Sequence, residues 1–342
     1  MSSFNPLTMF DMHVPQYCWS IDNPLFATLP RPVWSAALGM AGILLGFQAA
    51  QGPDKDLQPK GKGIGTLQHP PMPEQSAGNP QARPGGGPKS SGNGINYHGG
   101  PVMTDQTHIY YIWYGNWGGN TATSILQDLA MNIGGSPYYR INTTYTNGAG
   151  VPVSAAAVYV GSTAVTNYPY GTSLSDAQIR QVVLDAMISG ALPQDESGVY
   201  FVLTSADVTA SSGFCTQYCG WHTYSSMSVF NTSKVIKYSF VGNPDRCPSA
   251  CEAQTVSPNG NTGADGMASI IAHELEEAAT DPQLNAWYDT RGYENADKCA
   301  WTFNPSYPVA NGSFANMRLG LRDFLIQRNW VNANGGYCAL SY

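Results

Sequence analysis

Two stretches of sequence, THIYYIWY at 107–114 and GVYFVLT at 198–204, indicate the fold class of this 342-residue chain. Both are short runs of aromatic and β-branched side chains, which is the composition of a buried strand. Residues 153–161 are predicted to form another strand, and a last strand is predicted at 322–331. Apolar and polar side chains alternate in residues 234–241, which is the period of a half-buried strand.

Helical patterns separate these predicted strands. An amphipathic helix is expected around residues 121–133. Ser175 and Gln178 have the spacing of a capping box, which marks the start of a helix, and apolar residues follow at helical spacing. A third helix is expected at 265–280. Because helices alternate with strands, we expect an α/β fold in which a single domain is built on one mixed sheet.

The N-terminal part of the chain differs in composition from the rest. Residues 1–30 are predicted to be an unstructured extension. Residues 31–50 have a basic flank, an apolar run and small residues at the end, which is typical of a signal peptide or a membrane anchor. Residues 51–97 are rich in Gly and Pro and are predicted to be a disordered linker, followed by a globular domain at 98–342. We therefore expect a secreted protein, in the periplasm, at the cell surface or outside the cell, that meets a membrane only if residues 33–50 stay as an uncleaved anchor.

The balance of charge excludes one class of partner. Charged side chains make up 11% of the chain, and the formal net charge is −7. A nucleic-acid partner would need a basic surface that replaces phosphate counterions, and the sequence has no cluster of Lys and Arg. We expect no nucleic-acid partner.

Six of the seven cysteines lie in the C-terminal part of the chain, whereas Cys18 stands alone near the N-terminus. The six are Cys215, Cys219, Cys247, Cys251, Cys299 and Cys338. In an exported domain an even set of cysteines predicts disulfides, here three, with a pairing that the sequence does not resolve. A structural zinc site on the two Cys-x3-Cys pairs is the alternative.

Residues 265–282, DGMASIIAHELEEAATDP, cover the third helix and its predicted end and hold the most informative residues. Asp265 is the predicted N-cap, and Thr280-Asp281-Pro282 is the predicted end. At 100° per residue Glu274 falls within the apolar, core-facing sector, while Glu276 points the opposite way, to solvent. A carboxylate in a core-facing sector is unfavourable unless it is paired or bound to a cation.

A metal site follows from this arrangement. His273 and Glu277 are one helical turn apart and can bind one ion, as the two histidines of His-Glu-x-x-His do, and Glu274 takes the place of the general base. Glu294 or Asp297 is the expected third ligand. Zinc accepts imidazole and carboxylate ligands, while calcium, which prefers oxygen, is the alternative. A hydrogen-bonded acidic network without a metal is a further alternative.

His222 follows a Cys pair directly and is the expected fourth ligand or oxyanion donor. Among the other single residues, His108 is interpreted as a packed histidine. Several aromatic residues could form a sugar-stacking surface, although most of them are expected in the core. They are Trp113, Tyr114, Trp117, Tyr138 and Tyr139.

A series of motifs in this order resembles the EXORDIUM or phosphate-induced protein 1 family of plants and its bacterial relatives. The motifs include YHGGPVMT at 97–104, FCTQYCGWH at 214–222, CPSAC at 247–251, SPNGNTGADGMASIIAHELEE at 257–277 and ENADKC at 294–299. The resemblance implies an exported, extracellular or cell-wall protein, in which His-Glu-x-x-Glu and the six C-terminal cysteines are family traits. It implies no particular reaction.

Two functions are compatible with these residues. The first is an exported metallopeptidase-like hydrolase, acting on a peptide or cell-wall polymer, in which Glu274 is the general base, His222 assists, and His273, Glu277 and one of Glu294 or Asp297 bind zinc. The alternative is a non-catalytic extracellular or cell-wall-associated binding protein of the EXORDIUM type, with a structural metal or none.

Overall fold

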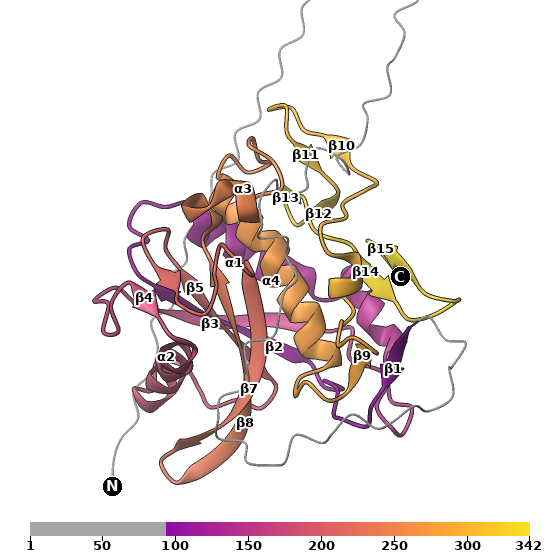
Figure 1. The fold of residues 1–342 in the computed structure, drawn as a ribbon, viewed down its shortest axis with the longest axis horizontal. Coiled ribbons are helices and arrows are strands. Elements are labelled where there is room, and N and C mark those ends of the chain that lie inside the picture. The colour runs from indigo at the N-terminus through magenta and orange to yellow at the C-terminus, as the bar shows by residue number, and fades with distance from the viewer. Residues whose placement is uncertain (1–93) are drawn as a thin grey trace, which may run out of the picture. The chain divides into compact units, whose positions relative to one another are not determined.

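A five-stranded mixed sheet in the order β3-β2-β5-β8-β7 lies at the centre of the computed structural model, which describes residues 94–342 (Figure 1). Strands β3, β2, β5 and β8 run parallel to one another, and β7 is antiparallel to β8. The strands are β2 Thr107–Tyr114, β3 Ala157–Val165, β5 Gly198–Thr204, β7 Gly220–Val229 and β8 Thr232–Gly242. The predicted extension at 1–30, the signal peptide or anchor at 31–50 and the linker up to residue 93 lie outside the described residues.

The central strands agree with the sequence pattern. Strands β2 and β5 have the predicted bounds, and every residue of β5 is buried. Strand β3 is at the edge and begins at Ala157 rather than at residue 153, because the preceding residues bond to other loops: Val153 N–H to Tyr145 O and Ser154 N–H to Met103 O. Strand β7 was not predicted, since polar side chains hide its pattern.

Helices cover both faces of the sheet. Helices α1, Ala122–Ile133, and α4, Thr262–Thr280, contact each other on one face, whereas α2, Asp176–Ile188, packs against β5, β7 and β8 on the other. Right-handed crossovers that run in opposite directions from β3 and β2 place their helices on opposite faces. The capping box of Ser175 and Gln178 is confirmed at the start of α2. The predicted mixed α/β domain is confirmed.

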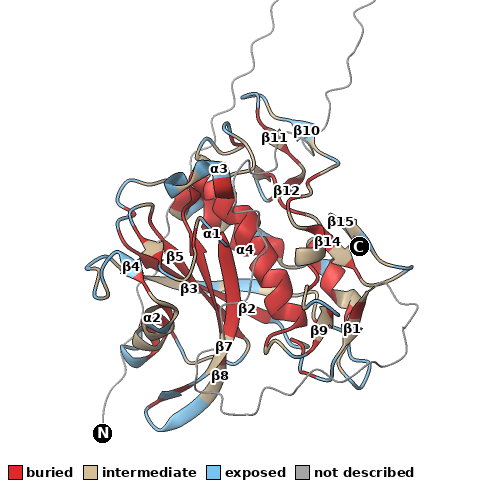
Figure 2. Ribbon diagram, viewed as in Figure 1, coloured by how far each residue is buried: buried red, intermediate tan, exposed pale blue. Residues whose placement is uncertain are grey.

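Helix α4 differs from the prediction at its start and on its outer side. It begins at Thr262 with Asn261 as N-cap, and Asp265 instead accepts two hydrogen bonds from Asn259. The end at Thr280 agrees with the prediction. Glu276, predicted to face solvent, is buried, as are all residues at 263–280 (Figure 2). The reason is the C-terminal part of the chain, which covers the side of α4 that the sheet leaves open.

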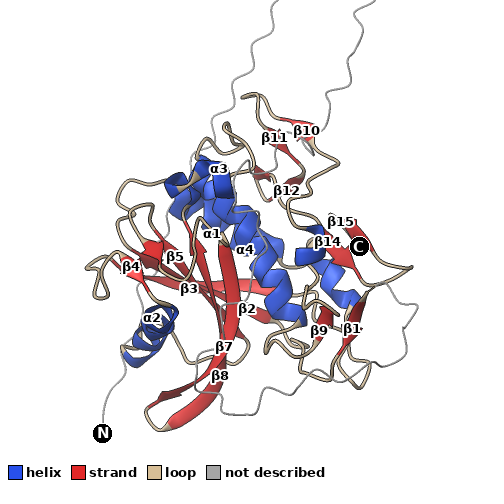
Figure 3. Cartoon of the chain, viewed as in Figure 1, coloured by secondary structure: helices blue, strands red, loops and turns tan. Residues whose placement is uncertain are grey.

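This C-terminal part consists of loops and short strand pairs (Figure 3). The predicted strand at 322–331 is divided between β13, Arg322–Phe324, and β14, Asn329–Val331, which belong to different hairpins. Residues Ile95–Tyr97, predicted as the end of the linker, form β1, which pairs with β9, Trp287–Asp289. The remaining pairs are β10 Tyr307–Pro308 with β11 Phe314–Ala315, β12 Met317–Leu319 with β13, β14 with β15 Tyr337–Ala339, and β4 Ser173–Leu174 with β6 Thr209–Ala210.

Short helical segments connect these elements: η1 Tyr139–Thr144, η2 Pro244–Arg246, α3 Pro248–Cys251 and η3 Asp297–Cys299. Three disulfides, Cys215–Cys247, Cys219–Cys251 and Cys299–Cys338, fasten them. The alternative prediction of a zinc site on the two Cys-x3-Cys pairs is wrong, because the sulfurs of these four cysteines form disulfides. No helix within residues 94–342 is long and apolar enough to span a membrane.

Candidate metal centre

Helix α4, strand β7 and the loop that leads into η3 place six titratable side chains together. His273, Glu274 and Glu277 come from α4 and His222 from β7. Glu294 and Asp297 come from the loop and from the first residue of η3. Each of the six side chains is 0–4% exposed. All six predicted site residues therefore lie in one buried cluster, named the α4 cluster below.

Glu277 lies between the two histidines. Its Oε1 is 3.0 Å from His273 Nε2, and its Oε2 is 3.7 Å from His222 Nε2. Glu294 Oε2 is 3.1 Å from His222 Nε2, and Asp297 Oδ1 is 3.7 Å from His273 Nε2. Two triads could each hold a cation, His222-Glu274-Glu277 and His273-Glu277-Asp297, since the ligand atoms within each lie within 4.8 Å of one another.

Glu274 is buried without a hydrogen-bond partner within residues 94–342. Neither of its carboxylate oxygens has a hydrogen-bond partner among the described residues, although its side chain is buried. Gly220 at the start of β7 allows this close approach of α4, because a Cβ at residue 220 would lie 2.5 Å from Ile270 Cγ2 and 3.2 Å from Glu274 Oε1. A buried carboxylate without a hydrogen bond is strongly unfavourable unless it is protonated or bound to a cation.

The pKa values of the buried side chains also show that charged carboxylates are unfavourable in the α4 cluster. Burial raises the pKa of Glu274 well above its usual value, and burial together with the Asp297 carboxylate raises the pKa of Glu277 to about 7. Burial alone would lower the pKa of His273, but the Glu277 and Asp297 carboxylates raise it well above the usual value. Without a cation, the α4 cluster therefore holds protons that solvent-exposed carboxylates would release.

Two neighbouring carboxylates have structural roles. The Oε2 of Glu276, on the other side of α4, accepts a 2.6 Å hydrogen bond from Asn329 Nδ2. Asp281 ends the helix, because its Oδ1 accepts the backbone N–H groups of Asn285 and Ala286, both at 2.6 Å. Sequence reasoning missed Gly220 and the Glu276–Asn329 contact. The only sequence signal for the role of Gly220 is its position directly before Trp221 and His222.

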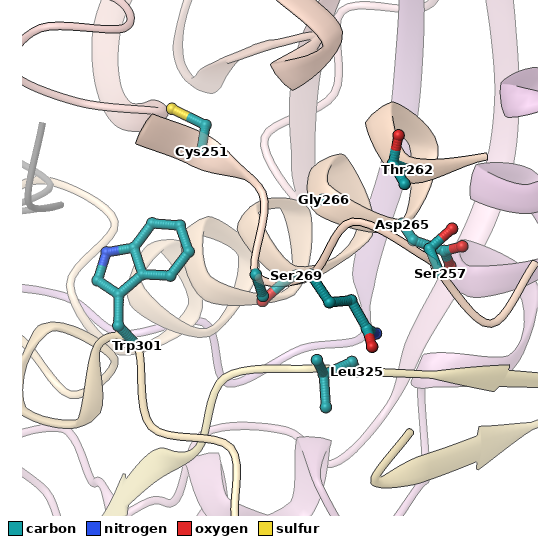
Figure 4. A pocket seen from close by; sticks show the side chains of 10 residues that line it. Cys251, Ser257, Thr262, Asp265, Gly266, Ser269, Trp301 and Leu325 are labelled. Carbon is teal, nitrogen blue, oxygen red and sulfur yellow. The ribbon is translucent and has the colours of Figure 1, made fainter. Parts of the chain in front are cut away.

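A small cavity beside α4 lies away from the α4 cluster. It has a volume of about 10 Å³ and lies at the N-terminal half of the helix, where its lining includes Cys251, Asp265, Ser269, Trp301 and Leu325 (Figure 4). None of the six residues of the α4 cluster lines it. A volume of this size suits one water molecule. It cannot accept a peptide beside His273.

Residues outside the α4 cluster have simpler environments. The side chain of His108 pairs with Asp195, with 2.6 Å between Nδ1 and Oδ2. The ring of His98 stacks on Tyr288, with 3.7 Å between the centroids. The five aromatic residues considered for sugar stacking are buried, so they belong to the core; they are Trp113, Tyr114, Trp117, Tyr138 and Tyr139.

Fold and site together define a disulfide-stabilised, mixed α/β protein with a buried cluster of histidines and carboxylates against its central helix. Residues 95–319 match the family described as "Phosphate-induced protein 1 conserved region". The chain belongs to this family, which confirms the resemblance seen in the sequence.

Plant proteins are among its relatives. Protein EXORDIUM-like 5 of Arabidopsis thaliana is 33% identical over 219 residues, which is 57% of this chain and 59% of that protein. Protein EXORDIUM-like 3 of the same plant is 31% identical over 218 residues, 57% of this chain and 64% of that protein. Protein PHOSPHATE-INDUCED 1 of Nicotiana tabacum is 26% identical over 219 residues, 57% of this chain and 67% of that protein. The matched part thus spans about three fifths of the first two relatives. No solved structure matches the chain.

Proposed function

We propose that this chain is a non-catalytic extracellular protein of the EXORDIUM type, in which the α4 cluster holds a divalent metal as a structural element. The observation that carries the proposal is Glu274, whose buried carboxylate has no hydrogen-bond partner within residues 94–342 and faces His222 and Glu277. A cation at this point would supply the missing partner.

The charges nearby favour a metal over an ion pair. No Lys or Arg among the described residues forms an ion pair with Glu274, Glu277 or Asp297. The closest basic side chain in sequence, Lys298, instead lies 3.5 Å from Asp289. Two imidazoles among the candidate ligands favour zinc, since calcium prefers a shell made of oxygen atoms only.

A structural role fits the position of the α4 cluster better than catalysis does. A catalytic zinc ion keeps one coordination position for water or substrate, and substrate must reach it. Glu274, the candidate general base, is 1% exposed, and His273 is 0% exposed. The metallopeptidase-like hydrolase is therefore the less well supported function. If Glu274→Gln abolished a peptidase activity of the purified chain, the non-catalytic proposal would be wrong.

The extracellular location is supported by the disulfides. Disulfides persist in oxidising compartments, and this chain has three among its described residues. A cell-wall polymer remains the proposed partner, as the family resemblance implies. Retention of the purified chain on insoluble polysaccharide tests it, and loss of retention on every such matrix would contradict it.

The metal is tested by removing it. We expect the full chain to contain zinc by elemental analysis, and its Tm to fall on dialysis against a chelator and to recover when zinc is added. The His273→Ala, Glu277→Ala double variant should contain no bound metal and should not respond to zinc. His98→Ala, which removes an exposed histidine, is the matched control. A metal-free chain that stays folded and binds neither zinc nor calcium would overturn the proposal.

A further inference from the structure

We propose that the α4 cluster is a two-cation centre in which the carboxylate of Glu277 bridges the ions. The first position is formed by His222, Glu274 and Glu277, and the second by His273, Glu277 and Asp297. This inference rests on the proposed function, because it requires that the α4 cluster binds metal at all.

The distances within the α4 cluster are those of coordinating atoms. Ligand atoms about 2.1 Å from a tetrahedral zinc ion are about 3.4 Å apart. His273 Nε2 lies 3.0 Å from Glu277 Oε1 and 3.7 Å from Asp297 Oδ1, so one ion fits between these three atoms. His222 Nε2 lies 3.7 Å from Glu277 Oε2 at the other position.

The two histidines do not share one ion in this arrangement. His222 and His273 belong to different triads, and Glu277 is the residue common to both. Its two oxygens face in different directions, Oε1 to His273 and Oε2 to His222. A carboxylate that turns one oxygen to each of two ligand sets has the geometry of a bridge between two ions, as in two-metal sites.

The charges balance with two ions. Glu274, Glu277, Glu294 and Asp297 are four buried carboxylates, and Glu294 joins the first position through its contact of 3.1 Å with His222 Nε2. Two divalent cations neutralise four carboxylates and leave both imidazoles neutral, as metal ligands must be. With one divalent cation, part of this negative charge would have to be neutralised by protons instead, because no Lys or Arg of the described part pairs with Glu274, Glu277 or Asp297.

Backbone N–H groups orient the bridging carboxylate of Glu277 and the carboxylate of Asp297 at the second position. The N–H of Asp297 donates to Glu277 Oε1 at 3.0 Å. The N–H of Glu294 donates to Asp297 Oδ2 at 3.3 Å, which leaves Asp297 Oδ1 for the ion near His273. Such hydrogen bonds to ligating carboxylates fix their orientation at metal sites.

Metal stoichiometry tests the proposal. The full chain, freed of metal and loaded with zinc, should retain two equivalents after desalting. Asp297→Asn and Glu274→Gln should each retain one equivalent, because each removes a ligand from one position only. Glu277→Gln should retain less than one. Glu276→Gln, which changes the buried carboxylate on the other side of α4, should retain two.

A second measurement does not depend on any variant. Cobalt(II) titrated into the metal-free native chain should bind in two equivalents, and the second should give the magnetic coupling of a bridged pair in the electron paramagnetic resonance spectrum. One equivalent in the native chain, lost in both Asp297→Asn and Glu274→Gln, would show a single shared ion and overturn the two-cation centre while leaving a structural metal in place. No bound metal at all would overturn the proposed function itself.

Discussion

Substitution of Glu274 should change the Tm in opposite directions in a metal-loaded chain and in a metal-free chain. In the metal-loaded chain Glu274→Gln removes a ligand, so we expect the Tm to fall by several degrees. In the metal-free chain the same change removes a buried carboxylate that has no hydrogen-bond partner within residues 94–342, so the Tm should rise or stay constant. Calorimetry with and without chelator measures both, and a Tm change of the same sign in both states would contradict a metal at Glu274.

Gly220 is the residue that lets strand β7 approach α4. An alanine Cβ there would lie 2.5 Å from Ile270 Cγ2 and 2.9 Å from the carbonyl oxygen of Phe240, so the packing must shift. Gly220→Ala should cost about 1–3 kcal/mol of unfolding free energy, as overpacking of a core does. Gly161→Ala is the control, because a Cβ at that glycine of β3 meets no atom within 4 Å. Equal stabilities of the two variants in chemical denaturation would show that β7 and α4 are less tightly packed than described.

The start of strand β2 is fastened to the loop before β5 through Asp195. Its Oδ2 lies 2.6 Å from His108 Nδ1 and accepts the hydroxyl of Tyr110 at 2.9 Å, while its Oδ1 accepts the N–H of Ser197 at 2.8 Å. Burial alone would raise the pKa of Asp195, but the hydrogen bonds from His108, Ser197 and Tyr110 outweigh it and lower the pKa below its usual value. The ionised carboxylate is therefore the form that the fold stabilises.

The sign of the pH dependence follows from that lowered pKa. The stabilisation by Asp195 is complete above its unfolded-state pKa of about 3.9 and is lost as the pH falls through the lower folded-state value. Asp195→Asn should therefore lower the stability by about 1 kcal/mol near pH 6, and this difference from the native chain should shrink below about pH 4. Asp105→Asn, at an exposed carboxylate, is the control. A difference that grows toward low pH would contradict this role for Asp195.

The elements show how far the sequence predicts this fold. Strands β2 and β5 were predicted with their observed bounds, because a buried strand has a local signature of aromatic and β-branched side chains. Strand β7 was not predicted, since polar residues such as His222 are buried in it by contacts distant in sequence. Helical spacing places Glu276 in solvent for the same reason, because the contact with Asn329 that buries it comes from the far end of the chain.

The candidate site was predictable in its members and not in its arrangement. The spacing of His273 and Glu277 on one helix predicts that they meet, and their Nε2–Oε1 distance of 3.0 Å agrees. The division of the α4 cluster into two triads around Glu277 depends on how β7 and η3 pack against α4, and helical spacing contains no information about that.

At the scale of the whole molecule, two of the disulfides differ in their relation to the α4 cluster. Cys299–Cys338 ties η3, which begins at Asp297, to strand β15, whereas Cys215–Cys247 lies in loops that supply none of the six side chains. The loop closed by Cys299–Cys338, with a sequence separation of 39 residues, predicts a stabilisation of roughly 3–4 kcal/mol. Cys215–Cys247 joins the same two segments as Cys219–Cys251, so it should contribute less. Removing either bond should therefore lower the stability of the chain, and removing Cys299–Cys338 should lower it more.

The two bonds should differ in their effect on metal. The Cys299→Ser, Cys338→Ser double variant loosens Asp297 and should lose zinc at a chelator concentration that the native chain withstands. The Cys215→Ser, Cys247→Ser double variant should be destabilised too but keep its zinc at that concentration. Elemental analysis after graded chelation, at a temperature where circular dichroism shows both variants folded, makes the comparison. Equal zinc loss from both would mean that metal retention follows overall stability, and then the η3 anchor would have no particular part in forming the site.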